Sequence, residues 1–187
     1  MGRLQDIVDH LLELASLENL KTLKKNVSIS SLVKTILESL RPIILKKQLT
    51  VVNRIKDDIM VSGDSFLLHR AIYNLIQNAV DFSPLHGQVT LSVKGEDARI
   101  KFVVADNGPG IPDYALDKVF EKFFSLQRPD TGRKSTGLGL NFVKEVAALH
   151  RGDVELKTER KGVPRQYSGW KAVTNRQSKR KKKSGYF

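Results

Sequence analysis

Two asparagines one helical turn apart are the first residues in this sequence whose types and spacing suggest chemistry. Asn74 and Asn78 stand in an otherwise apolar stretch, and their spacing places both amides on one face of a predicted helix. A buried amide costs free energy unless it is hydrogen-bonded, and its oxygen is a hard neutral ligand that suits Mg²⁺ held jointly with substrate phosphates. Two exposed amides on a helix are the plainer alternative.

A glycine-rich turn at residues 106–110, which read Asp-Asn-Gly-Pro-Gly, follows directly after a predicted strand. The alternate glycines, Gly108 and Gly110, allow backbone conformations closed to other residues and leave room for a flat ligand. The carboxylate of Asp106 can only accept hydrogen bonds, so it would prefer the exocyclic amine of adenine to the carbonyl of guanine. Taken alone, the segment could equally be an ordinary turn.

A second pair of glycines opens a predicted helix at residues 135–140, which read Ser-Thr-Gly-Leu-Gly-Leu. Glycines at a helix start let backbone N–H groups and the helix dipole face a phosphate. The Gly-Lys-Ser/Thr triplet of a P-loop and the third glycine of a Rossmann loop are both absent here. Between the two glycine-rich segments, residues 120–124 contain three phenylalanines that we expect to anchor a loop to the body of the protein.

The elements that must position these segments follow from hydrophobic periodicity. Apolar residues at helical spacing predict a helix that begins at Gly63-Asp64 and ends at Ser83-Pro84, and another over residues 138–149. A further helix is predicted from a Ser30 or Ser31 cap to about Lys47, bent or interrupted by Pro42. Strand-like runs, the fourth and fifth forming a hairpin, stand at residues 26–29, 50–55, 60–61, 89–93, 100–104 and 153–158. Residues 106–136 predict a long functional loop with a short helix near 115–120.

An amphipathic helix is predicted over residues 3–20, ahead of these elements. Its apolar stripe is wide for a helix without a partner, so we expect it to pack against another helix, as in a dimer. A helix laid on its own domain is the alternative. The stripe consists of Leu4, Ile7, Leu11, Leu14 and Leu17, widened by Val8 and Leu12.

The composition excludes several classes of protein. The net charge is +12, but the residues from Lys157 onward carry +10 of it, which argues against a DNA-binding face on the folded domain. No nucleic-acid partner is therefore expected. The absence of cysteine excludes disulfides and thiolate metal sites. No apolar run approaches the roughly 18 residues of a membrane span, and the N-terminus does not read as a signal peptide, so we expect a cytoplasmic chain.

In their order and spacing, the four segments resemble the N, G1, F and G2 boxes of sensor histidine kinases, within the ATPase superfamily shared with gyrase, Hsp90 and MutL. The resemblance covers about residues 1–163. It implies an α+β fold, a two-layer α/β sandwich of the Bergerat type, which binds ATP and Mg²⁺. The predicted domain occupies residues 25–163, after the second helix of a dimerisation hairpin at residues 1–24.

The resemblance also implies a role for each motif. Asn78 would ligate Mg²⁺, Asn74 would help to hold the phosphates, and Asp106 would accept a hydrogen bond from the adenine amine. Phe82 would lie beside the base, and residues 113–136 would form a mobile lid over the site. The remaining candidates are Gly108 and Gly110 in the adenine pocket, Thr136, Gly137, Leu138 and Gly139 at the triphosphate, and Lys122, Arg128, Arg133 and Lys134 as lid contacts to phosphate.

The expected reaction is phosphoryl transfer to a histidine, and from there to a response regulator receiver domain. In the gyrase and Hsp90 branches a glutamate activates water at the position of Asn74, and an amide cannot act as that base. Asp81 replaces a lysine that is frequent in kinases, which puts one usual phosphate contact in doubt. His10, His69, His86 and His150 do not match the acceptor motif, so the acceptor would lie outside this chain, and a homodimer would form through residues 1–20 of a completed hairpin. A non-catalytic, nucleotide-binding remnant is the alternative.

Residues 164–187 are predicted to be a disordered basic tail. Where the resembling kinases continue into a final apolar strand, this sequence has Pro164 and scattered charges, which suit a central strand poorly. We therefore expect a sheet with an uncovered edge, and a frameshift is one explanation of the change. Binding of nucleic acid or acidic lipid by this tail is a further alternative.

Overall fold

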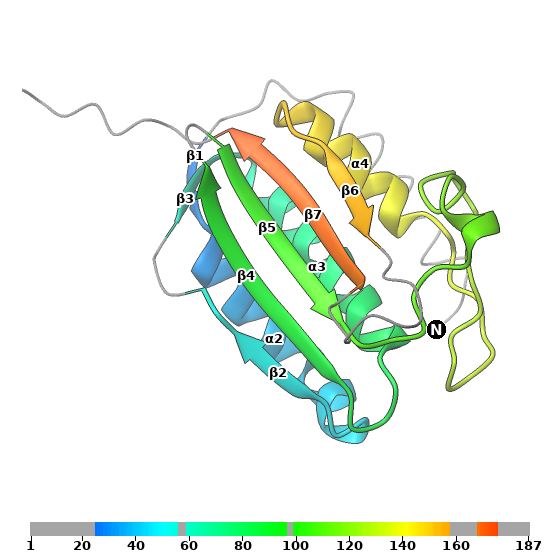
Figure 1. The fold of residues 1–187 in the computed structure, drawn as a ribbon. Helices are drawn as coiled ribbons and strands as arrows, with labels where there is room; N and C mark the ends of the chain where they lie inside the picture. The colour runs from blue at the N-terminus through cyan, green and yellow to red at the C-terminus, as the bar shows by residue number, and fades with distance from the viewer. Residues whose placement is uncertain (1–24, 56–58, 97–98, 158–167, 176–187) are drawn as a thin grey trace, which may run out of the picture.

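The computed structural model describes residues 25–55, 59–96, 99–157 and 168–175 (Figure 1). The predicted helix at residues 3–20 lies outside these residues. The helices are α2 (Ile29–Lys46), α3 (Ser65–Phe82) and α4 (Gly139–Leu149), with a short 3-10 helix, η1 (Asp113–Ala115). The strands are β1 (Lys25–Ser28), β2 (Thr50–Asn53), β3 (Met60–Gly63), β4 (Gln88–Glu96), β5 (Arg99–Asp106), β6 (Val154–Lys157) and β7 (Ser168–Asn175).

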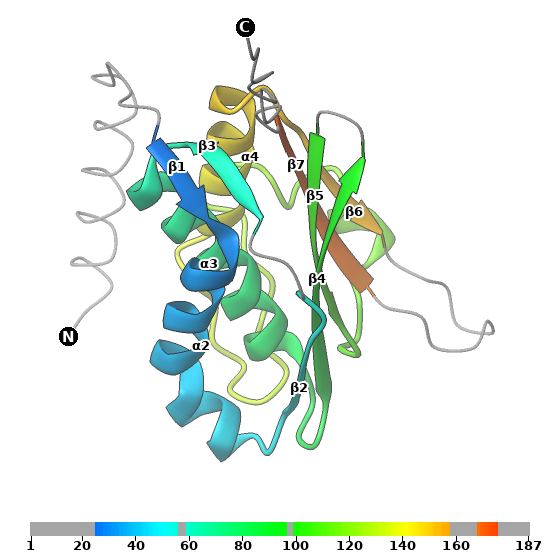
Figure 2. The same ribbon diagram turned by 90° about the vertical axis from the view of Figure 1, so that its left-hand side faces the viewer.

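The fold is a two-layer α+β sandwich, as predicted. Five strands form one sheet in the order β2-β4-β5-β7-β6, in which β2 pairs parallel to β4 and the other neighbours are antiparallel. The strands β1 and β3 form a separate antiparallel pair. Figure 2 shows α2, α3 and α4 together on one side of the five-stranded sheet. None of the helices in the described residues is both long and apolar enough to span a membrane.

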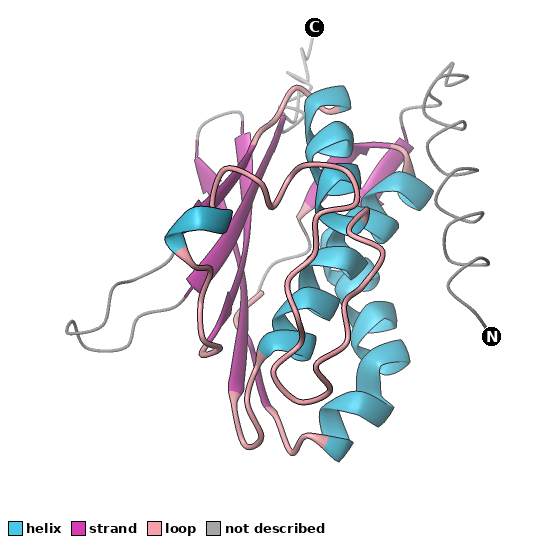
Figure 3. Cartoon of the chain, turned by 90° about the vertical axis from the view of Figure 1, so that its right-hand side faces the viewer, coloured by secondary structure: helices cyan, strands magenta, loops and turns pink. Residues whose placement is uncertain are grey.

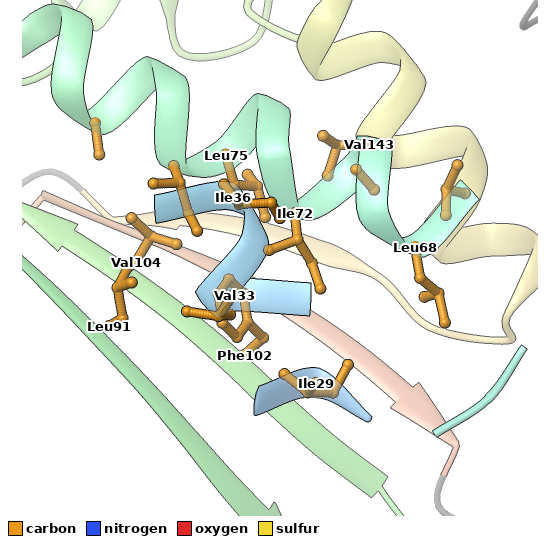
Figure 4. Close-up of a cluster of buried hydrophobic side chains, with 14 of the residues drawn as sticks. Ile29, Val33, Ile36, Leu68, Ile72, Leu75, Leu91, Phe102, Val104 and Val143 are labelled. Atoms are coloured by element: carbon orange, nitrogen blue, oxygen red, sulfur yellow. The ribbon is translucent and has the colours of Figure 1, made fainter. Parts of the chain in front are cut away.

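The core lies between the helices and the sheet because each helix turns its apolar stripe inward (Figure 4). Val33 and Ile36 of α2 and Leu75 of α3 are fully buried against Leu91 and Val104 of the sheet. Burying one such aliphatic side chain contributes about 1.5–3 kcal/mol relative to leaving it exposed. This packing fixes the face of α3 that remains free to line a site.

Two predictions for α2 were wrong, the residue that caps it and the effect of Pro42. The cap of α2 is Ser28, whose Oγ accepts a hydrogen bond from Ser31 N at 3.1 Å, and neither Ser30 nor Ser31 begins the helix. Pro42 does not interrupt α2, because it lies on the exposed side, where water can reach the carbonyl that loses its helical partner. The cap of α3 is Asp64, as the sequence indicated, with Oδ1 accepting from Phe66 N and Leu67 N at 2.9 and 3.0 Å.

The prediction that the folded domain ends at residue 163 was wrong. Residues 168–175, assigned to a disordered tail, form β7 inside the sheet, with β5 on one side and β6 on the other. The sheet therefore has no uncovered edge at β5. Pro164 precedes the strand and removes no N–H from its ladder. The rest of the predicted tail, residues 164–167 and 176–187, lies outside the described residues.

The predicted short helix near residues 115–120 is also displaced. The structure has the single 3-10 turn η1 at Asp113–Ala115, and turns follow it to Phe123. Pro112 fixes the start of this turn, and Ala115 is buried, so the segment is anchored by its first residues and not by a continued helix.

Candidate functional site

A pocket of about 370 Å³ lies beside α3 and draws residues from all four sequence motifs. Its volume is within the range of small-molecule sites, about 300–1,000 Å³. The predicted site residues that line the pocket are Asn74, Asn78, Phe82, Asp106, Gly110, Arg128, Lys134, Thr136, Gly137 and Gly139. The structure thus brings together segments that are separated by up to half of the described chain.

Four other predicted residues do not line the pocket. Lys122 and Arg133 are exposed elsewhere on the loop. Leu138 is buried and precedes α4, so it fixes the start of this helix and does not contact the pocket. Gly108 packs closely against Asp106 and the backbone of Phe82, and so affects the pocket only through these residues.

The carboxylate of Asp106 is held in place at the end of β5. Its side chain is buried, and Oδ1 accepts a hydrogen bond from Gly108 N at 2.9 Å. A Cβ at position 108 would lie 2.7 Å from Phe82 O and 2.8 Å from Asp106 Oδ1. Any side chain here would displace either the end of α3 or the carboxylate, so the G1 segment needs glycine at this position.

One face of α3 supplies the polar wall of the pocket. Asn74 is buried, and its Nδ2 donates to Gly139 O at 3.3 Å, which ties α3 to the first turn of α4. Asn78 lies one turn further on and is half-buried. Among the described residues its amide has no hydrogen-bond partner, so its oxygen and nitrogen remain available to a ligand.

Three further residues of this face were missed by the sequence analysis. Arg70, Tyr73 and Gln77 also line the pocket, and the Arg70 guanidinium lies over the Tyr73 ring at 5.7 Å from its centroid. They fall at helical spacing with Asn74 and Asn78. That periodicity of polar residues was the signal that could have identified them.

The second glycine-rich motif meets the aromatic segment at Gly137. Its φ is +72°, and a Cβ there would lie 2.5 Å from Phe123 C and from Phe124 O. Phe123 N donates to Gly137 O at 3.0 Å, and Asn141 Nδ2 of α4 donates to Phe120 O at 3.1 Å. The aromatic segment is therefore anchored to the start of α4, largely through its backbone. Phe120 packs against the core, but Phe123 is 66% exposed, so the prediction that all three phenylalanines anchor the loop was wrong for Phe123.

Within the predicted lid, residues 125–135 form a closed loop that we call the lid hairpin (Figure 3, pink, beside the helices). Ser125 Oγ accepts from Ser135 N at 2.9 Å, Gln127 and Lys134 form an isolated β-bridge, and Arg128 N donates to Arg133 O at 3.0 Å. These bonds give the hairpin a definite shape and carry Arg128, Lys134 and Thr136 to the pocket.

Asp81 is a buried carboxylate at the C-terminal end of α3, next to Phe82. Burial raises the pKa of Asp81 above its ordinary value of 3.8, against the opposing pull of the Arg128 guanidinium and, more weakly, of Lys47. Asp81 is not among the described residues that line the pocket, whereas Arg128 is.

The donor set of the pocket fits magnesium only together with a ligand. No cluster of three or more His, Cys, Asp or Glu side chains that could hold a metal ion occurs in the part of the chain that the structure describes. The unpartnered amide of Asn78 offers a single hard oxygen. Because Mg²⁺ requires about six oxygen ligands, the rest would come from phosphates and water.

The layered fold and the pocket built from these motifs define an ATP-binding domain of the histidine kinase type. The chain belongs to the family of histidine kinase-, DNA gyrase B- and HSP90-like ATPases, whose sequence profile matches residues 63–176 and so includes β7. The resemblance read from the sequence is confirmed.

The relatives include sensor histidine kinases of known sequence and structure. Sensor protein CreC of Escherichia coli (strain K12) is 38% identical over 162 residues, which are 86% of this chain and 34% of CreC. The mycobacterial sensor histidine kinase MprB is 27% identical with a TM-score of 0.70, covering 82% of this chain and 97% of the solved MprB chain. Full-length ShkA, solved in complex with AMPPNP, is 26% identical with a TM-score of 0.72, covering 91% of this chain and 35% of ShkA. The chain thus spans about a third of the length of CreC.

Proposed function

We propose that this chain binds ATP with Mg²⁺ and transfers the γ-phosphoryl group to a histidine on a separate dimerisation hairpin. In this step the bond from the γ-phosphorus to the β–γ bridging oxygen breaks, a bond from phosphorus to an imidazole nitrogen forms, and ADP leaves. A receiver-domain aspartate of a response regulator would then accept the phosphoryl group from the histidine.

The observation that carries this proposal is the lack of a base beside Asn78. Among the described residues that line the pocket, Asp106 is the sole carboxylate, and its Oδ1 is bonded to Gly108 N. Asn74, one turn before Asn78, has an amide that cannot take a proton, and its Nδ2 is committed to Gly139 O. A pocket without a base to activate water favours keeping ATP for transfer over hydrolysing it.

Different pocket residues would contact the base, the magnesium ion and the phosphates of the nucleotide. Asp106 would accept a hydrogen bond from the adenine amine, and Phe82 would lie against the base. Asn78 would hold magnesium, which neutralises charge on the phosphates when it is bound. Lys134, Thr136 and the backbone at Gly137 and Gly139 would contact the phosphates, which suits a helix start.

The partners follow from the reaction. A histidine kinase of the same fold, ThkA, has been solved in complex with the response regulator TrrA, with a TM-score of 0.71 and 17% identity to this chain. We propose that a response regulator is also the final acceptor here, that residues 1–20 pair with a second copy in a completed hairpin, and that the domain works in the cytoplasm, where ATP is available.

The test supplies the acceptor in trans. The chain would be mixed with a variant of CreC that no longer binds ATP, so that any label on CreC must come from the added chain. With γ-labelled ATP we expect acid-labile, base-stable label on CreC, and none when the added chain carries Asn78→Ala. ATP binding with no label on CreC at any ratio of the two proteins would favour a nucleotide-binding module without transfer.

A further inference from the structure

The lid hairpin is fastened to the end of α3 by a partly buried ion pair. Arg128 Nη2 and Nε lie 2.7 and 2.9 Å from Asp81 Oδ2, and the two side chains are 28% and 7% exposed. A carboxylate this deeply buried needs a charged partner, and removing one member of such a pair leaves the other uncompensated. Pairing with Arg128 therefore avoids the cost of an uncompensated buried charge at Asp81.

A second contact holds the same hairpin to the end of α2. Lys47 is buried at the C-cap of α2, and its Nζ lies 3.0 Å from Asp130 Oδ2. The same Nζ donates to Val80 O at 2.8 Å and to Asp81 O at 2.9 Å. Since an ammonium group has three N–H donors, all of them are used. Lys47 thus joins α2, the last carbonyls of α3 and the hairpin at one point.

We propose that Asp81 is a positioning residue that holds Arg128 at the pocket as a cation for the terminal phosphates of the nucleotide, with the Lys47–Asp130 pair fixing the hairpin around it. The inference rests on the proposed function in that ATP is taken as the ligand of this pocket. It assigns a role to three residues that do not line the pocket, namely Asp81, Lys47 and Asp130.

The donor geometry of Arg128 allows both contacts at once. A guanidinium carries five N–H groups, and Asp81 engages one on Nε and one on Nη2. The Nη1 group and the second Nη2 hydrogen have no other acceptor among the described residues. Because Arg128 lines the pocket and Asp81 does not, the carboxylate orients one edge of the guanidinium and leaves the other for a phosphate.

The arrangement also explains why a carboxylate is buried beside an anion site. Alone, Asp81 would repel a polyphosphate and would be costly to bury. Paired with Arg128 and close to Lys47, it belongs to a cluster with two cations and two carboxylates, counting Asp130. Bound phosphate would meet the cationic edge of this cluster.

The experiment is a double-mutant cycle on the full chain with Arg128→Gln, Asp81→Asn and their combination. Dissociation constants for ATP and for AMP, which lacks the two terminal phosphates, would be measured by calorimetry with Mg²⁺. Arg133→Gln is the matched control, since it removes a cation from the same hairpin that neither lines the pocket nor pairs with α3. Circular dichroism and thermal melts would establish that each variant is folded.

We expect Arg128→Gln to weaken ATP binding about tenfold or more, as for loss of charge-assisted bonds, with AMP changed no more than about twofold. Asp81→Asn should weaken ATP binding in the same direction, and should add almost nothing when Arg128 is already glutamine. Arg128→Lys should recover part of the loss. A purely structural pair would lower ATP and AMP binding alike.

Three results would overturn the proposal: unchanged ATP affinity in Arg128→Gln, tighter ATP binding in Asp81→Asn, or additive effects in the double variant. Tighter binding would mean that Asp81 competes with phosphate for Arg128. These outcomes all presuppose ATP binding by the wild-type chain, so they are distinct from failure of the proposed function, in which the wild type itself would not bind or would not transfer.

Discussion

The two halves of the pocket are built by different means. On the body side, Asp106, Gly108 and the polar face of α3 belong to a strand end, a tight turn and a helix packed into the core. On the lid side, Arg128 and Lys134 belong to the lid hairpin and Thr136 directly follows it. The hairpin is held by its own hydrogen bonds and by two ion pairs. The body half is held by packing, whereas the lid half is held largely by charge.

This difference suggests that the body side stabilises the pocket, whereas the lid side sets its affinity for phosphates. Apolar packing in the core contains no charges for salt to screen. In the Lys47–Asp130 pair the Asp130 side chain is 43% exposed, so salt should weaken this pair. Substitutions on the body side should therefore abolish the adenine contact or the fold itself. Substitutions on the lid side should change affinity for the phosphates by smaller steps.

The largest effect is expected at the junction of the two halves. Gly137→Ala combines a positive φ with a Cβ 2.5 Å from backbone atoms, so it should lower the free energy of unfolding by about 2–4 kcal/mol. Gly132→Ala is the control, because it has a φ of +63° but open space around it, and should cost only about 1–2 kcal/mol. Urea denaturation of both variants measures the difference. Equal losses would show that the close contact at Gly137 relaxes freely.

On the body side, Asp106→Asn should weaken ATP binding about tenfold to a hundredfold, as expected when a hydrogen bond to a charged acceptor is lost. The ratio of ATP to GTP affinity should fall as well, because an amide can also donate to the guanine carbonyl. Asp113→Asn, an exposed acid at the start of η1, is the control and should bind like wild type. Unchanged ATP affinity and selectivity in Asp106→Asn would place the adenine elsewhere.

At the attachment of the lid, Lys47→Met should lower the free energy of unfolding by about 1–2 kcal/mol, because two buried carbonyls of α3 lose their donor. Lys46→Met, one residue earlier and exposed, should change it by less than about 0.5 kcal/mol. Thermal or urea unfolding of the pair gives the comparison. A wild-type value for Lys47→Met would mean that the three contacts of Nζ contribute no net stability.

The smallest effect is a pH dependence from Asp81. Since burial raises its pKa in the folded state above 3.8, the folded chain binds more protons than the unfolded chain just above that pH, and stability falls as pH rises through the window. The Asp81→Asn variant lacks this titrating carboxyl group and the pH dependence of stability that it causes. The wild type should therefore lose stability relative to Asp81→Asn as the pH is raised from about 4, in paired urea titrations. A gain instead would mean that Arg128 outweighs burial.

Local patterns placed each motif of the body half on its element, and the family resemblance implied that these motifs share one site. The periodicity of α3 put Asn74 and Asn78 on one helix face, and the strand pattern put Asp106 at a strand end, because each motif is contained within one element. The pair of Asp81 with Arg128 joins residues 47 positions apart, and nothing in either local sequence specifies it. Asp81 was interpreted as a missing phosphate contact, when the structure shows it to be the partner of a lid cation.

The error at β7 has a related cause. The strand β7 is stabilised by its pairing with β5 and β6, which lie far from it in the sequence. Its eight residues were overlooked because the basic composition of residues 164–187 was judged as a whole. The serine cap of α2 illustrates the same limit at short range. Four serines and asparagines stand within six residues, and only the backbone geometry selects Ser28.

Calorimetric titration of the chain with ATP would show whether the pocket is an intact Mg-ATP site that uses Asn78. We expect binding at millimolar Mg²⁺ that weakens markedly when the metal is chelated, and loss of that metal dependence in a folded Asn78→Ala variant. Absence of ATP binding by the folded wild-type chain, or identical Mg²⁺-dependent binding by Asn78→Ala, would contradict this expectation.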